Sequence, residues 1–155
     1  MFRTRNIAYG GTAAVVTSTA VISGLSAAGA ERPLIASALL IAAVADNLAD
    51  ALSIHVFLES EHLNQKEALT GAATNFLARL LLCISFIPFI VIVPLQHVEK
   101  TAIAWGMSLL ILLTYLVARE RGANVGREVA KHLVVAFIVI TASIAAGHWI
   151  GRLFS

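Results

Sequence analysis

Five long apolar stretches constrain the fold of this sequence more than any other feature. Each approaches or exceeds the length needed to cross a bilayer, which is about 20 apolar residues in a helix that rises about 1.5 Å per residue. The predicted spans are residues 8–28, 34–57, 70–95, 102–118 and 130–150. The sequence therefore predicts an all-α integral membrane protein, with one five-helix transmembrane domain over residues 1–155.

The composition agrees with a membrane protein and excludes several other classes. Apolar residues make up 59% of the chain and charged residues 13%, whereas soluble proteins contain about 45–50% and about 25%. This balance excludes a soluble enzyme and a disordered regulator. The formal net charge is only +2 and no basic run with interleaved aromatic residues is present, so we expect no nucleic-acid partner. Cys83 is the lone cysteine and cannot staple the chain.

The Lys and Arg residues near the ends of the spans predict the orientation. With a cytoplasmic N-terminus, seven of them lie on the cytoplasmic side: Arg3, Arg5, Lys66, Arg119, Arg121, Arg127 and Lys131. Three lie on the far side: Arg32, Lys100 and Arg152. This asymmetry predicts an N-in, C-out protein, in the plasma (inner) membrane if the source is bacterial.

An alternative interpretation of the N-terminus is a cleavable signal peptide. Arg3 and Arg5 precede an apolar run, and Ala28-Gly29-Ala30 resembles a cleavage site. The run from residue 7 to residue 27 is longer than a usual signal-peptide core and is rich in Thr and Ser, which favours a membrane span.

Ionisable residues inside the spans are the strongest functional signal, because a charge in hydrocarbon costs at least about 2.5–3.5 kcal/mol. Asp46 and Asp50 are four residues apart on the second span and share a helical face. They should lie about 18 Å and about 12 Å from the cytoplasmic end, and Arg79 of the third span about 13 Å deep. We therefore expect a structural ion pair between Arg79 and Asp50, with Asp46 unpaired near the midplane. Protonation or a bound cation would relieve that charge.

Small residues follow nearly the same face of the second span as the two aspartates. They are Ala42, Ala45, Ala49 and Ser53. Small side chains allow a second helix to approach closely, so we expect the two carboxylates to point into the bundle.

A second group of candidate ligands lies at the cytoplasmic end of the second span. His55, Glu59 and His62 are spaced i, i+4 and i+7, which places them on one stripe if the helix continues past Leu58. Imidazole and carboxylate together suit Fe, Mn, Zn or Ni ions. The alternative is a solvated charged turn in which His55 reaches the interface without a ligand.

Two prolines and a glycine-containing segment predict where helices bend or end. Pro88 should bend or interrupt the third helix, Pro94 should mark its end, and residues 120–127 should form a turn capped by glycine.

The sequence contains no nucleophile elbow, no His-Glu-x-x-His and no phosphate-cradling loop, so we expect no enzymatic activity. We also expect no permanently bound cofactor.

Several segments, in order along nearly the whole chain, resemble one known family. They are residues 11–15, 20–25, 47–54, 59–61, 73–77, 87–89 and 145–153, the last ending in Ile150-Gly151-Arg152-Leu153. In this order they are similar to the vacuolar iron transporter family. The resemblance implies a five-helix protomer that forms a homodimer and exports Fe(II) or Mn(II) from the cytosol in exchange for protons.

The resemblance also implies roles for residues. It places a transport carboxylate or polar amide at Asp46. The chain departs from the family at Ala13, where an aspartate is expected, and at Ile54, where a methionine is expected. It also lacks the Glu-rich cytoplasmic domain that many members insert between helices two and three.

The leading interpretation is a divergent proton-coupled metal transporter, whose substrates are a divalent metal ion and protons. Asp46 would be its central ligand, Asp50 the partner of Asp46, and His55, Glu59 and His62 a cytoplasmic access site. The alternative is a non-transporting membrane scaffold or assembly partner derived from the same family.

Overall fold

A computed structural model describes residues 2–60 and 65–154, and this part of the chain is built of α-helices with no strand. The helices are α1 (Phe2–Ala27), α2 (Arg32–Ser60), α3 (Gln65–Ile84), α4 (Ile87–Ile92), α5 (Leu95–Glu120) and α6 (Val125–Phe154). Five segments of the described chain are long and apolar enough to cross a bilayer: Gly10–Ala27, Arg32–Phe57, Leu69–Ile92, Leu95–Glu120 and Val125–Phe154. The predicted all-α architecture with five such helical segments is confirmed.

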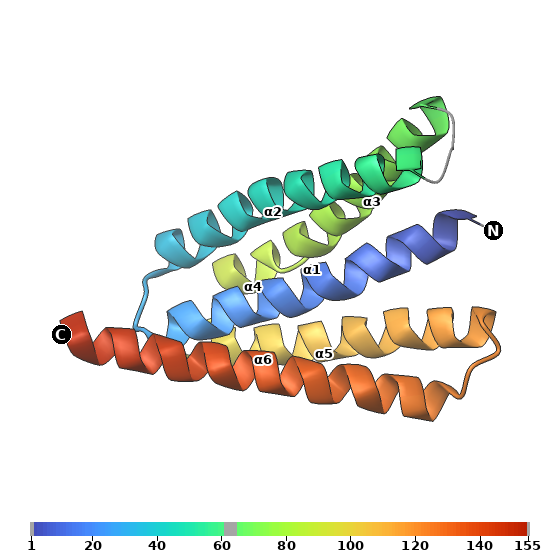
Figure 1. Ribbon diagram of the computed structural model, residues 1–155. Coiled ribbons are helices and arrows are strands. Elements are labelled where there is room, and N and C mark those ends of the chain that lie inside the picture. Colours follow the sequence, from blue (N-terminus) through green and yellow to red (C-terminus); the bar gives the residue numbers. More distant parts are fainter. Residues whose placement is uncertain (1, 61–64, 155) are drawn as a thin grey trace.

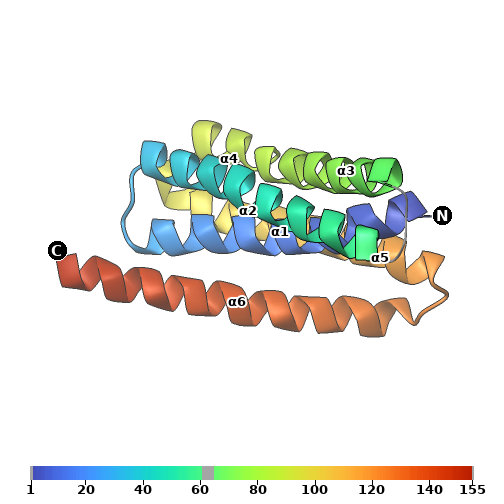
Figure 2. The ribbon, with the colours of Figure 1, turned by 45° about the horizontal axis from the view of Figure 1, so that its top comes forward.

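Helix α1 is the centre of the bundle and packs against α2, α3, α5 and α6 (Figures 1 and 2). In Figure 1, α2 and α3 lie on one side of α1, and α5 and α6 lie on the other. The core contains branched and aromatic side chains from several helices, including Ile22, Leu39, Phe86 and Leu110. The N-terminus and the α5–α6 turn lie at one end of the bundle, and the C-terminus and the α1–α2 turn lie at the other.

Small residues bring α1 and α6 into close contact. A Cβ added at Gly147 would overlap the carbonyl oxygen of Gly24, and one added at Gly24 would overlap Ser143. Ser143 Oγ also donates a hydrogen bond of 2.7 Å to the carbonyl of Ala20. Without a hydrophobic force between helices in lipid, close backbone approach and such hydrogen bonds hold the pair together.

The third crossing is interrupted, as its proline predicts. Helix α3 ends at Ile84 and α4 begins at Ile87, with Pro88 in the first turn of α4. Proline lacks the backbone donor that a continuous helix needs. Trp105 of α5 holds the break by donating a 3.0 Å hydrogen bond from Nε1 to Ser85 Oγ. Helix α4 ends before Pro94, which is the residue preceding α5.

The long helices begin before the spans that the sequence predicts, and α5 and α6 show the consequence. Helix α5 begins at Leu95, not at residue 102, and α6 begins at Val125, not at residue 130. The charged segment His97 to Lys100 is therefore helical, not a connection between spans. Long charged side chains can reach the interface from a helix end, so charge does not terminate a helix. The predicted glycine cap is confirmed at Gly122, whose φ is 64°, whereas Gly126 lies within α6.

Candidate intramembrane charged site

Arg79 of α3 joins the two aspartates of α2 in one cluster. Its side chain is buried, with a relative exposure of 3% for the residue. Nη1 donates to Asp50 Oδ2 at 2.7 Å and Nη2 donates to Asp46 Oδ2 at 2.9 Å. Nε donates to Asn47 Oδ1 at 2.7 Å. One guanidinium thus uses its planar fork of donors on three acceptors of the neighbouring helix.

The Arg79–Asp50 contact has the geometry that the sequence led us to expect, but the expectation for Asp46 is wrong. Asp46 is not unpaired, because Arg79 reaches both carboxylates at once. The expectation failed because it assigned the guanidinium to a single carboxylate. The five donors of an arginine can serve two carboxylates that are one helical turn apart.

The expected inward orientation is also wrong for Asp46, whose side chain is 53% exposed, compared with 35% for Asp50. The buried stripe of α2 is Ile35, Leu39, Ala43 and Asn47. At about 100° per residue, Asp50 lies about 60° from Asn47, whereas Asp46 lies about 100° away, at the edge of the buried face. Ala45, Ala49 and Ser53 are likewise exposed. The helix expected against this small-residue face is not supplied by the described part of the same chain.

Asn75 of α3 links Asp50 to α1. Its Nδ2 donates to Asp50 Oδ2 at 3.1 Å, and the residue is completely buried. Its Oδ1 has no hydrogen-bond partner among the described residues. That oxygen lies against Gly10, where an added Cβ would overlap it. The absence of a side chain at Gly10 of α1 therefore allows this close approach.

A small, mostly apolar groove between α1 and α2 reaches the cluster. Its lining combines apolar residues of both helices with Ser18, Asp46 and Asn47, and its volume is about 10 Å³, which is room for about one water. Ser18 Oγ and Asn47 Nδ2 both donate toward Cys83 Sγ, at 3.3 Å and 3.9 Å. Asp46 is therefore the carboxylate of the cluster that borders this groove.

The second group of candidate ligands lies beyond the cluster on α2. His55 Nε2 is 3.4 Å from Glu59 Oε1, and His55 Nδ1 is buried without a partner among the described residues. His62 lies outside the described residues. His55 is about 7.5 Å along the helix axis from Asp50 and about 140° around it, so the aspartates and His55 face different directions.

The described residues contain no group of three or more His, Cys, Asp or Glu side chains that could hold a metal ion in this conformation. Four of the five candidate ligands fall into two separate pairs: Asp46 and Asp50, which both bond to Arg79, and His55 with Glu59. The fifth, His62, lies outside the described residues. At the positions where the family resemblance implied ligands, Ala13 is exposed and Ile54 is partly buried.

Sequence reasoning missed the two amides of the site, Asn47 and Asn75. Both are completely or almost completely buried, and each bonds a charged member of the cluster. A signal was available: Asn75 lies four residues before Arg79, and Asn47 lies between the two aspartates, so each is within one turn of an intramembrane charge.

No protein-family model, curated protein or solved structure that was compared with the chain matches it.

Proposed function

We propose that this chain is a proton-coupled transporter of divalent metal ions, Fe(II) or Mn(II), which it exports from the cytosol. The observation that carries the proposal is the charge balance of the site, where two carboxylates share one guanidinium. With all three groups ionised, the site carries one surplus negative charge inside a span that is apolar enough for the bilayer. A surplus charge at that depth needs a compensating cation.

The surplus charge suggests how proton and metal movement would be coupled. A proton on Asp46 would neutralise the cluster, whereas a divalent cation beside the same carboxylate would replace the surplus negative charge with a surplus positive one. The two states exclude one another, because both use the carboxylate that borders the groove. Asp50 and Arg79 would remain paired in both states, supported by Asn75 and Asn47.

Further support comes from the sequence. The resemblance to vacuolar iron transporters implies metal and proton exchange, and the Lys and Arg distribution supports the N-in, C-out orientation. His55 and Glu59 would form part of a cytoplasmic access site. We propose a homodimer as well, with the exposed small residues of α2 (Ala45, Ala49 and Ser53) against the second copy.

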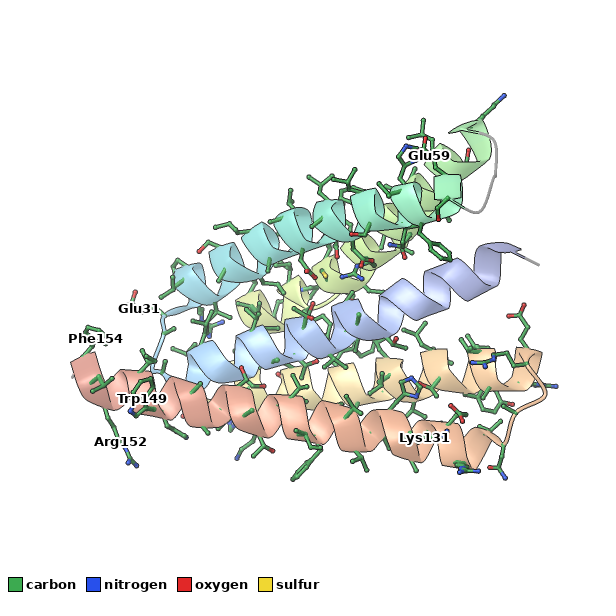
Figure 3. The ribbon with its side chains drawn as sticks, in the orientation of Figure 1. Glu31, Glu59, Lys131, Trp149, Arg152 and Phe154 are labelled. Carbon is green, nitrogen blue, oxygen red and sulfur yellow. The ribbon has the colours of Figure 1, made fainter. Side chains whose placement is uncertain are left out.

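Metal uptake by proteoliposomes tests the transport proposal. Vesicles with an acidic lumen would contain one dye that reports Mn(II) and another that reports pH. We expect the wild type to take up Mn(II) while the lumen becomes alkaline, and Asp46→Asn to do neither, since an amide cannot exchange a proton for a cation. Glu31→Gln is the matched control, because Glu31 is an exposed acid outside the site (Figure 3).

The control should transport like the wild type. Equal Mn(II) uptake by the wild type and by Asp46→Asn would overturn the role of Asp46. An absence of Mn(II) and Fe(II) flux in the wild type, in vesicles that contain folded protein, would overturn the transport proposal itself.

One observation favours a second function, a non-transporting membrane scaffold. Arg79 is bonded through Nε, Nη1 and Nη2 to three acceptors on α2, which is also the arrangement of a lock between two helices. A scaffold would show no change in thermal stability with Mn(II) or Fe(II), whereas a transporter that binds the ion would be stabilised by it.

A further inference from the structure

The turn between α5 and α6 has a defined backbone structure. Gly122 adopts a left-handed conformation, its N–H donates to the Arg119 carbonyl, and the Ala123 N–H donates to the Ala118 carbonyl. These are the paired hydrogen bonds of a Schellman helix end. Asn124 then caps α6, since its Oδ1 accepts from the Arg127 N–H at 3.0 Å. The backbone positions on either side of this turn are therefore held in a fixed arrangement.

Basic side chains dominate this turn. Its four basic residues are Arg119, Arg121, Arg127 and Lys131, and its two acidic residues are Glu120 and Glu128. The four basic residues and Glu120 are exposed. Glu128 is bonded to Lys131 at 2.7 Å. None of the described carboxylates lies within ion-pair distance of the three arginines.

Tyr115 indicates the depth at which the turn would lie in a bilayer. Its side chain is exposed on α5 one turn before Arg119, and Arg119 Nη1 donates to the Tyr115 hydroxyl at 3.2 Å. Tyrosines at the ends of membrane spans are enriched at headgroup level. With Tyr115 at that level, Arg121 and Arg127, whose guanidinium groups are bonded to no described residue, would lie at the height of lipid phosphates.

The opposite end of the bundle differs in charge. There Arg32 donates to the carbonyls of Ile90 and Val91 at 2.7 Å and 2.9 Å, so its guanidinium already has partners. Lys100 and Arg152 remain, and Glu31 and Glu99 lie at the same end. Figure 3 shows Lys131 toward one end of the bundle and Glu31 and Arg152 toward the other.

We infer that the α5–α6 turn binds the headgroups of anionic phospholipids, with Arg121 and Arg127 as the principal contacts and Arg119 supporting them. Guanidinium groups pair with phosphate through two parallel hydrogen bonds. Each basic residue near an anionic bilayer surface strengthens binding by about fivefold, the equivalent of about 1 kcal/mol. This inference is independent of the proposed transport activity, since none of these residues belongs to the charged site.

Native mass spectrometry of the full chain in a neutral detergent tests the inference. Phosphatidylglycerol and phosphatidylcholine would be titrated against the wild type, Arg121→Gln/Arg127→Gln and the matched control Lys100→Gln/Arg152→Gln. The control removes the same number of charges from exposed positions at the other end of the bundle. We expect the wild type and the control to retain phosphatidylglycerol in preference to phosphatidylcholine. The Arg121→Gln/Arg127→Gln variant should bind phosphatidylglycerol about fivefold to thirtyfold more weakly.

Three further measurements distinguish charge-dependent headgroup binding at the turn from other causes of lipid retention. Raising the salt from 0.01 M to 1 M shortens the screening length from about 30 Å to about 3 Å, so the preference should fall in the wild type. The single variant Arg127→Gln should lose part of the preference, which keeps the test decisive if the double variant does not fold. Equal losses in the two double variants, or equal retention of the two lipids by the wild type, would overturn the inference. Equally strong competition by glycerol phosphate at the lipid concentration would assign the turn to soluble phosphates instead.

Discussion

At the scale of single residues, Arg79 determines what the charged site can do. Taking a guanidinium out of water costs several kcal/mol, and only well-oriented partners offset that cost. Arg79 has three such partners within 3 Å, two of which carry charge. The same geometry gives the two aspartates different roles. Asp50 is half-buried and also bonded by Asn75, whereas Asp46 is the more exposed and borders the groove.

Charge balance predicts opposite effects of neutralising Arg79 and Asp46 on stability. Arg79→Gln removes the guanidinium that bonds two carboxylates and the Asn47 carbonyl, so it should lower the free energy of unfolding by about 3 kcal/mol, the lower end for a broken buried pair. Asp46→Asn removes the surplus charge and should leave stability unchanged or raised. Thermal unfolding in detergent, followed by circular dichroism, compares the two.

A rescue variant separates charge from packing at this position. Adding Asp46→Asn and Asp50→Asn to Arg79→Gln removes every charge of the cluster, so most of the lost stability should return. If the triple variant is as unstable as Arg79→Gln alone, the side-chain packing of Arg79, not its charge, stabilises the contact between α2 and α3.

At the scale of the helices, the sequence predicted the crossings better than their ends and faces. Apolar length alone is enough to identify five spans, and Pro88 is enough to locate a break. The start of α5 at Leu95 was missed because Glu99 and Lys100 are polar enough to suggest a loop, although a helix end at the interface accommodates them. The exposure of Asp46 was missed because periodicity gives relative angles on a helix, and only packing against α1 and α3 decides which angle is buried.

The same reasoning explains which parts of the site were predictable. Asp46, Asp50 and Arg79 stand out because charge in hydrocarbon is rare. Asn75 does not, since an amide is tolerated in many helices, and its role depends on Gly10 of α1 allowing the two backbones to approach. Contacts between helices that are distant in sequence leave no periodic pattern in a single chain.

The exposed small-residue face of α2 gives a prediction for the homodimer. In a background with Cys83→Ser, Ala49→Cys should form a disulfide between two copies in the membrane, because a disulfide requires Cα atoms within about 7 Å. Ala142→Cys on α6 is the matched control, since Ala142 is also a small exposed residue in a span. Non-reducing electrophoresis should show a dimer for Ala49→Cys alone. Similar cross-linking of both variants, or of Ala142→Cys only, would place the contact elsewhere.

At the scale of the whole molecule, the two ends of the bundle must lie on opposite sides of the membrane if the five apolar segments cross it. An odd number of crossings separates the N-terminus from the C-terminus, and Figure 1 shows the two termini at opposite ends. The α5–α6 turn shares its end with the N-terminus. The proposed orientation and the leaflet in which anionic lipid would be bound are therefore linked.

Cysteine labelling in intact cells tests this orientation. Lys100 and Arg121 are exposed at opposite ends of α5, and native Cys83 is buried, with an exposure of 4%. In the Cys83→Ser background, Lys100→Cys should react with a membrane-impermeant maleimide from outside, and Arg121→Cys only after the membrane is permeabilised. The reverse pattern would invert the orientation and would place the α5–α6 turn on the outer side of the membrane. Labelling of both positions in intact cells would contradict a membrane-spanning α5, because both ends of one span cannot face the same side.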